Sequence, residues 1–242
     1  MIPAVWSWLG RIPFAEAVAV QERARAAIVR GDGPETLLFA EHDPVVTLGR
    51  WARDASLLVS RADLARRGVA CHRASRGGDV TYHGPGQLVG YPIVRLRQGV
   101  VAHVSAMARA VVAVLAELGI ESAWRRETPG VWVGDAKICA FGVHVRNRVA
   151  MHGFALNVAN DLAGFDLIVP CGIAGARVTS IGRALRADAR APALHVLASR
   201  VAAALGSELA TTFVPDIDRA AKHLVIPKQI EMSGGITRML EA

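Results

Sequence analysis

The pattern of apolar and polar positions predicts three helices. Residues 15–30 are rich in alanine with spaced charges, and Gly31 follows them as a stop signal. Residues 100–118 form a second strongly helical segment, which ends in Glu117-Leu118-Gly119. A third helical segment is predicted near residues 193–205.

Strand patterns fill much of the remaining chain. Residues 36–40 and 45–48 are short candidates separated by His42-Asp-Pro44, and 130–133, 136–145 and 149–157 are longer ones. Gly134-Asp135 predicts a tight hairpin turn, and Asn147 with its neighbours predicts the next turn. Strands joined by turns, with a few long helices between groups, predict an α+β fold with packed helices and a mixed, largely antiparallel sheet.

The chain shows no linker, low-complexity segment or internal repeat, so one domain spanning residues 1–242 is expected. The tail after about residue 207 has mixed character. It is read either as a small appended lobe or as a poorly ordered end.

Composition places the protein among globular proteins of the cytoplasm. Apolar residues make up 52% of 242, and no apolar run is read as long enough to cross a membrane. The N-terminus lacks a basic region before its apolar residues, and Arg11 interrupts them, which argues against a secretory signal. Three cysteines without repeated spacing argue against a disulfide framework and favour a reducing compartment.

The charge balance points to an acidic partner. The net charge is +7, from 28 Lys and Arg against 21 Asp and Glu. Nucleic acid, an anionic membrane and acidic proteins would each suit such a charge. The basic residues are dispersed, with few aromatics between them, so nucleic acid and membrane are disfavoured and acidic proteins are favoured.

The segment Ser75-Arg-Gly-Gly-Asp-Val-Thr-Tyr-His-Gly-Pro-Gly-Gln87 holds four glycines and a proline. Glycine permits positive φ and close approach to a ligand, and proline fixes φ. We therefore expect neither an ordinary helix nor an ordinary strand here, but a constrained loop from which Arg76, Tyr82 and His83 project. Such a loop shapes a binding site, and the alternative is a rigid surface turn.

Cys171 is a candidate nucleophile. It follows the apolar run Leu167-Ile-Val-Pro170 and precedes Gly172, which places the thiol at a strand end or loop. Most lone cysteines are small buried hydrophobic residues, and that alternative stays open. A reactive thiolate would need a nearby cation to lower the pKa of the thiol.

Lys137 is the candidate cation. Besides Lys222 and Lys228 it is the one lysine of the chain, and it interrupts an otherwise apolar strand pattern. It is either a charged gatekeeper on an edge strand or a partly desolvated acid and base that faces a polar site. Cys139 would share its strand face.

Other chemistry is not indicated by the sequence. Cys71 is read as strand core, and its neighbour His72 would point to the opposite face. His83 and His152 are flanked by glycine, but no ligand spacing typical of a metal site occurs, so no metal is expected. A nucleotide-binding P-loop and a serine-hydrolase elbow are also missing.

Taken together, these segments resemble the bacterial octanoyltransferases of lipoate biosynthesis. The signature is Arg76–Gln87, and four further blocks follow the family order: Glu41–Gly49, Gly130–Val133 leading to Lys137-Ile138, His152–Asn157, and Ile168–Ile173 followed by Val178-Thr-Ser180. The resemblance covers about residues 36–182. Asp43 stands where proline is common, and Cys139 where a small residue such as alanine is usual.

The resemblance implies the fold of lipoate and biotin protein ligases, with a sheet covered by helices on one side. It implies transfer of an octanoyl group from octanoyl-acyl carrier protein to a lysine of lipoyl domains, such as those of 2-oxoacid dehydrogenases and the glycine cleavage H protein. The family's nucleophile maps onto Cys171 and its partner lysine onto Lys137. The implied octanoyl-binding residues are Arg76, Gly77, Gly78, Asp79, Val80, Thr81, Tyr82, His83, Ala140, Phe141, Gly142, Gly153, Phe154 and Ala155.

The acyl chain itself needs an apolar slot, for which Leu88 and Phe154 are candidates. No cofactor is expected, and a monomer is the simplest assembly. Three rivals remain at this point: an ATP-dependent lipoate or biotin ligase that does not need Cys171, a non-catalytic module that binds acyl carrier protein, and a nucleic-acid binder. The sequence does not report acyl chain length.

Overall fold

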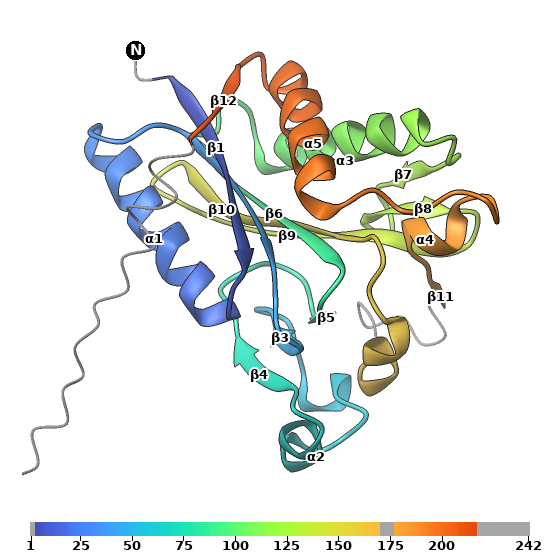
Figure 1. The fold of residues 1–242 in the computed structure, drawn as a ribbon. Helices are drawn as coiled ribbons and strands as arrows, with labels where there is room; N and C mark the ends of the chain where they lie inside the picture. The colour runs from blue at the N-terminus through green and yellow to red at the C-terminus, as the bar shows by residue number, and fades with distance from the viewer. Residues whose placement is uncertain (1–2, 170–176, 217–242) are drawn as a thin grey trace, which may run out of the picture.

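The computed structural model describes residues 3–169 and 177–216 (Figure 1). Its larger sheet contains β1 (Ala4–Arg11), β2 (Thr36–Glu41), β6 (Gln87–Ile93), β7 (Ala123–Arg125), β8 (Gly130–Val133), β9 (Ala136–Arg146), β10 (Val149–Asn157), β11 (Arg177–Val178) and β12 (Phe213–Pro215). The strand order is β12-β1-β2-β6-β10-β9-β8-β7, with β11 also paired to β9. Within this larger sheet, as far as the described residues go, only the pairs of β1 with β2 and β12, and of β9 with β11, are parallel. The predicted mixed, largely antiparallel sheet is therefore confirmed.

Helices cover both faces of this sheet. The helices are α1 (Phe14–Arg30), α2 (Arg61–Arg66), α3 (Val100–Glu117), α4 (Ile181–Ala184) and α5 (Leu194–Glu208). Figure 1 shows α1 on one side of the sheet and α3 with α5 on the other. Two hydrophobic cores lie on the two faces of the sheet, one beneath α1 and one beneath α3 and α5. Along β2, Leu38 packs in the core beneath α1, whereas Leu37 and Phe39 pack in the core beneath α3 and α5.

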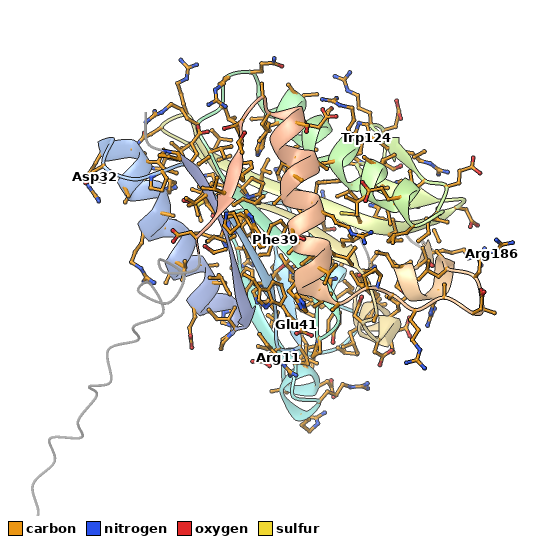
Figure 2. All side chains as sticks on the ribbon, turned by 45° about the horizontal axis from the view of Figure 1, so that its top comes forward. Arg11, Asp32, Phe39, Glu41, Trp124 and Arg186 are labelled. Atoms are coloured by element: carbon orange, nitrogen blue, oxygen red, sulfur yellow. The ribbon has the colours of Figure 1, made fainter. Side chains whose placement is uncertain are left out.

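The expectation of helices on one side is wrong. Residues of β6 and β10 are buried throughout both strands, so both of their faces must be covered. Figure 2 shows Phe39 in the interior of the molecule, and it has no exposed surface. Helix α3 is long and apolar enough to span a membrane by length and composition, contrary to the sequence reading. It is nevertheless a core helix here, because residues such as Met107, Val111 and Leu115 pack against the sheet.

A smaller sheet in the order β4-β3-β5 lies beside the large one, formed by β3 (Val45–Leu48), β4 (Ala70–Arg73) and β5 (Val80–His83). It corrects the reading of the glycine-rich segment, because Val80–His83 is a strand and Gln87 begins β6. The β-branched and aromatic residues between the glycines pair with β3, so only residues 74–79 and 84–86 are loop. Cys71 lies in β4 as predicted but is only partly buried.

The glycine and asparagine signals predicted the sharp turns of the chain correctly. Helix α1 ends at Gly31 with φ 87°, and the β8–β9 hairpin turns at Gly134 with φ 54°. Asn147 and Arg148, at φ 53° and 61°, form the next hairpin turn. Up to residue 216 the tail joins the main sheet through β12, which pairs with β1, and the rest of the tail lies outside the described residues.

Candidate active site

A cavity lies on the face of the sheet that α1 covers. Its lining includes most of the residues expected to hold the acyl group: Arg76, Val80, Thr81, His83, Ala140, Phe141, Gly142, Gly153, Phe154 and Ala155. Gly77, Gly78, Asp79 and Tyr82 are not among the lining residues. Phe14, Val89, Tyr91 and His152 complete the lining. The structure thus brings three separate sequence blocks together, and what binds there stays a prediction.

The floor of this cavity is made by small residues in register. Gly142 lies opposite Gly153, and Ala140 lies opposite Ala155, on the paired strands β9 and β10. The two glycines allow neighbouring segments to come close, because a Cβ on Gly142 would lie 3.0 Å from Cδ of Arg76 and one on Gly153 would lie 2.3 Å from the carbonyl oxygen of Gly90. Val89 and Phe14 add apolar walls to the cavity, so it suits a hydrocarbon chain.

A second, smaller cavity adjoins the first on the side of Lys137, and the two together are called the channel below. The two cavities share Thr81, Ala140 and Ala155 as lining residues. The second is also lined by Gln87, Lys137, Ile138, Cys139, Asn157, Phe165 and Val178. The apolar channel therefore leads along β9 to an ammonium group.

Lys137 is buried in the middle of the sheet. Only 6% of it is exposed, its Nζ donates to the carbonyl oxygen of Pro129 at 3.2 Å, and Nζ lies 5.0 Å from the centre of the Trp132 ring. Strand β9 lies between β8 and β10, so the reading as an edge gatekeeper is wrong. A Cβ on Gly130 would lie 2.8 Å from Cε of Lys137, which explains why glycine is needed beside this side chain.

Cys171, the predicted nucleophile, lies outside the described residues. The next described residues of the chain approach Lys137, because Val178 pairs with it and the amide of Thr179 donates to its carbonyl oxygen at 2.9 Å. Cys139 lines the same small cavity as Lys137, as its strand position predicted. It is 1% exposed, and burial raises the pKa of its thiol although the charge of Lys137 lowers it, so the thiol stays protonated at neutral pH.

His83 is held neutral and in one tautomer. The amide nitrogen of Gln87 donates to the carbonyl oxygen of Tyr82 at 3.2 Å and to Oδ1 of Asn157 at 2.9 Å. The Gln87 Oε1 atom therefore faces His83, and Nδ1 of His83 donates to it at 2.7 Å. Burial, followed by the nearby His42, lowers the pKa of His83 to about 3. The lone pair of His83 is consequently on Nε2, where the Thr47 hydroxyl, 3.4 Å away, can donate to it.

A second buried pair supports this wall of the cavity. Nδ1 of His42 donates to the carbonyl oxygen of Ile12 at 2.8 Å, so its Nε2 accepts from the Tyr91 hydroxyl at 2.6 Å. Burial lowers the pKa of His42 and raises that of Tyr91. Sequence reasoning did not select either residue, although His42 stands in the quoted block that begins at Glu41.

Arg76 and Tyr82 are placed differently relative to the cavity. The Arg76 guanidinium donates to backbone oxygens of Thr47, Gly77 and Asp79, so it binds the loop while the side chain borders the cavity. Tyr82 turns away and packs against Phe165, with ring centres 5.7 Å apart.

The two candidates for the apolar slot divide in the same way. Leu88 has no exposed surface and lies in the core of the opposite sheet face. Phe154 does line the cavity. Phe154 also packs in the same core as Leu88, whereas Val89, the next residue of β6, points to the cavity side.

Comparisons with protein families and with individual proteins point to the same family. The sequence profile of the lipoyl protein ligase A/B catalytic domain matches residues 13–205. An octanoyltransferase of Chloroflexus aurantiacus is 46% identical over 209 residues, which cover 84% of this chain and 92% of that protein. An octanoyltransferase of Solibacter usitatus is 48% identical over 168 residues, or 68% of this chain and 76% of that protein.

Solved structures share the fold at low identity. A putative lipoate protein ligase from T. acidophilum with bound lipoic acid superposes with a TM-score of 0.71 at 18% identity, covering 92% of each chain. Lipoate-protein ligase A bound with ATP gives a TM-score of 0.69 at 17% identity, also over 92% of each chain. Biotin protein ligase from Aquifex aeolicus, in complex with biotin and ATP, gives 0.52 at 12% identity, over 87% of this chain and 71% of that one.

Proposed function

The chain belongs to the octanoyltransferases within the lipoyl protein ligase A/B catalytic domain family, and we propose that it moves an octanoyl group from octanoyl-acyl carrier protein to a lysine of lipoyl domains. The observation that carries the proposal is the apolar channel floored by Ala140, Gly142, Gly153 and Ala155, which leads to the buried Lys137. An acyl chain in this channel would bring its carbonyl end toward that ammonium.

The proposed first step is thioester exchange on Cys171. Lys137 accepts the proton of the Cys171 thiol, or holds its thiolate as an ion pair. The thiolate attacks the thioester carbonyl, the bond from that carbon to the carrier sulfur breaks, and the carrier thiolate takes a proton from Lys137. Backbone amides near Cys171, such as that of Gly172, would stabilise the oxyanion.

The second step transfers the group to the acceptor. The neutral amine of the acceptor lysine attacks the octanoyl thioester, the bond to Sγ of Cys171 breaks, and the amine proton passes through Lys137 to that sulfur. One thioester is exchanged for another at little free-energy cost, and amide formation runs downhill. No ATP is needed for this sequence.

The partner proteins are proposed from charge. The net charge of +7 favours acidic proteins, and acyl carrier protein and lipoyl domains are the expected ones. Exposed Arg50 and Arg53 flank Trp51, which is 72% exposed and donates its amide to Gly78 of the glycine-rich loop at 3.2 Å. An encounter guided by charge should weaken with salt, so a transfer rate that is insensitive to added salt would count against it. A monomer and a cytoplasmic location complete the proposal; Cys71 and Cys139 are free thiols.

Intact mass measures the acyl-enzyme directly. Purified protein is incubated with octanoyl-acyl carrier protein without ATP, beside Cys171→Ala and Cys139→Ala variants. We expect one octanoyl group on the wild type and on Cys139→Ala, and none on Cys171→Ala. Acylation of Cys171→Ala would assign the thioester to another nucleophile, and no acylation of any protein would reject covalent transfer.

The same proteins separate the main rival. An ATP-dependent ligase would modify a lipoyl domain from free acid and ATP, and would keep that activity in Cys171→Ala. The octanoyltransferase proposal expects no such activity from either protein. A module that only binds acyl carrier protein would form a complex with it and remain unmodified in mass.

A further inference from the structure

Two large apolar side chains face water in the loop between β3 and α2. Trp51 is 72% exposed and Leu58 is 59% exposed, the highest values among the large hydrophobic residues of the described chain. Ala52 and Leu57 of the same loop pack against the core of the smaller sheet instead. A loop that is anchored by some of its apolar side chains and presents others to water is typical of an interaction site.

Arginines surround these two apolar side chains. The segment 50–73 has six arginines and two acidic residues. All six arginines are exposed: Arg50, Arg53, Arg61, Arg66, Arg67 and Arg73. Among the described residues, the one ion pair within this segment joins Arg66 to Asp63. We call Trp51, Leu58 and the six arginines the Trp51 surface; in Figure 1 it belongs to the end of the molecule that carries α2 and β4.

One side of the Trp51 surface is bonded to the loop that borders the channel. The amide of Trp51 donates to the carbonyl oxygen of Gly78 at 3.2 Å. The amide of Gly77 in turn donates to the carbonyl oxygen of Val143 in β9 at 2.9 Å. Val143 follows Gly142, which lines the channel. The backbone beneath Trp51 is therefore connected to the channel wall by two successive hydrogen bonds.

The other side of the surface is bonded to the segment that leads to Cys171. The amide of Leu58 donates to the carbonyl oxygen of Leu167 at 3.0 Å, and the amide of Val169 donates to that of Ser56 at 2.9 Å. Val169 precedes Cys171 by two residues in the sequence. The loop that carries Trp51 and Leu58 thus runs from the channel wall to the last described residue before the proposed nucleophile.

The segment on the other side of Lys137 has a different charge balance. Residues 121–135 include β7 and β8, and Pro129 among them accepts the hydrogen bond from the Lys137 ammonium. This segment has two arginines and three acidic residues. An acidic protein that approaches the site is therefore attracted to the Trp51 surface and not to the β7–β8 hairpin.

We propose that the Trp51 surface is where the acyl carrier protein docks when it donates its octanoyl group. The inference rests on the proposed function and deepens it, because it assigns the donor protein to a named surface. The donor has to place its whole acyl chain in the channel, and the surface is bonded to the loop at the channel wall. The acceptor lysine has only to reach the thioester, so the lipoyl domain does not need this surface.

The two kinds of side chain have separate tasks in the docked complex. The arginines attract the acidic carrier and orient it, which raises the rate of encounter. Trp51 becomes buried against an apolar patch of the carrier, as tryptophan often does at the centre of a protein interface. The loss of either contribution should weaken the donor complex without changing the chemistry at Lys137.

The test compares a protein-bound donor with a small donor in matched variants. Trp51→Ala and Arg53→Glu change the surface. Val101→Ala shortens an apolar side chain that is 55% exposed on α3, and Arg186→Glu makes the same charge change at an exposed position after α4 (Figure 2). For each protein, the second-order rate constant of acylation from octanoyl-acyl carrier protein is divided by that from octanoyl-pantetheine, which has the same thioester but no protein.

We expect this ratio to fall about 10-fold in Trp51→Ala and in Arg53→Glu, which corresponds to about 1.4 kcal/mol for each variant. It should stay at the wild-type value in Val101→Ala and Arg186→Glu. An unchanged ratio in both surface variants, with circular dichroism spectra like that of the wild type, would overturn the inference. Because a ratio is used, a general loss of activity does not imitate the effect.

A second measurement separates the donor from the acceptor. Each protein is first acylated with octanoyl-pantetheine, and the rate of transfer to a lipoyl domain is then followed by mass. We expect the two surface variants to transfer at the wild-type rate. Slower transfer, together with an unchanged donor ratio, would assign the surface to the lipoyl domain and refute its assignment to the carrier.

Calorimetry keeps this inference separate from the proposed function. The affinity for acyl carrier protein without its acyl group is measured for the same proteins, and we expect the Kd to rise about 10-fold in Trp51→Ala and Arg53→Glu alone. If the wild type forms no acyl-enzyme, the proposed function fails, whereas these affinities still decide where the carrier binds. Equal affinities of all the proteins would refute docking on the Trp51 surface.

Discussion

Replacing Arg76 with lysine should destabilise the protein strongly although the charge is kept. Arg76 is 8% exposed, and its guanidinium holds the glycine-rich loop to β3. Its Nη2 donates to the carbonyl oxygen of Thr47 at 2.6 Å and to the Thr47 Oγ1 at 2.8 Å. Its Nη1 donates to the carbonyl oxygens of Gly77 at 3.1 Å and Asp79 at 2.8 Å.

The size of the effect follows from the acceptors left behind. These oxygens lie around the planar guanidinium of Arg76. The lysine side chain is shorter and ends in a single ammonium nitrogen, so it can donate hydrogen bonds to only some of them. A hydrogen bond from a charged donor contributes about 1.5–3 kcal/mol, and an unpaired buried acceptor carries its own desolvation cost. Losing two or more such bonds gives a loss of about 3–5 kcal/mol in the free energy of unfolding.

Urea unfolding of the wild type, Arg76→Lys, Arg76→Met and Arg186→Lys measures this. Arg186 projects from the surface (Figure 2), so its replacement should change the free energy of unfolding by less than about 0.5 kcal/mol. Arg76→Lys and Arg76→Met should both lower the midpoint at unchanged slope. If Arg76→Lys unfolds at the midpoint of the wild type, charge at this position is sufficient and the fork-like hydrogen bonding is not what holds the loop.

Three further predictions concern buried histidines and the lysine site. Burial lowers the pKa of His83 and of His152 from 6.5 to about 3. Between about pH 3 and pH 6.5 the unfolded chain therefore binds more protons than the folded protein. The free energy of unfolding is thus at its full value above about pH 6.5 and falls as the pH drops toward 3. Urea midpoints should be lower at pH 5 than at pH 7.5, and His152→Asn, which tolerates positive φ, should reduce that difference; an unchanged difference would contradict a neutral buried imidazole. Gly130→Ala should displace the Lys137 ammonium, because the new Cβ would lie 2.8 Å from its Cε, and should slow acylation about 10²-fold with an unaltered circular dichroism spectrum; full activity would mean that the position of the ammonium is not critical. His103 is 4% exposed with an unpartnered Nε2 in the described structure, and burial lowers its pKa to about 4; His103→Leu should raise the free energy of unfolding by about 1 kcal/mol, and a lower urea midpoint would show that the imidazole is needed for packing.

The regular elements of the fold could be predicted where the signal is local. The alanine-rich run before Gly31 and the alternation in 136–145 report backbone conformation directly, because a helix or a strand places side chains at fixed intervals. The same logic failed at Val80–His83, where glycine-rich flanks suggested a loop. Pairing with Val45–Leu48, far away in sequence, decided the conformation instead.

Some features of the candidate site could likewise be predicted from the sequence, and others depended on the tertiary structure. The sequence by itself determined the family, the blocks that line the channel, and the placement of Lys137 within an apolar strand. The described structure decided that Lys137 is buried between strands and that α1 closes the channel. It also brought Gln21 to His152, which are 131 residues apart. Periodicity shows which face of an element is apolar, but it does not show which other element packs on that face. Contacts between distant segments depend on how all the faces are covered at once, and that is a property of the tertiary structure.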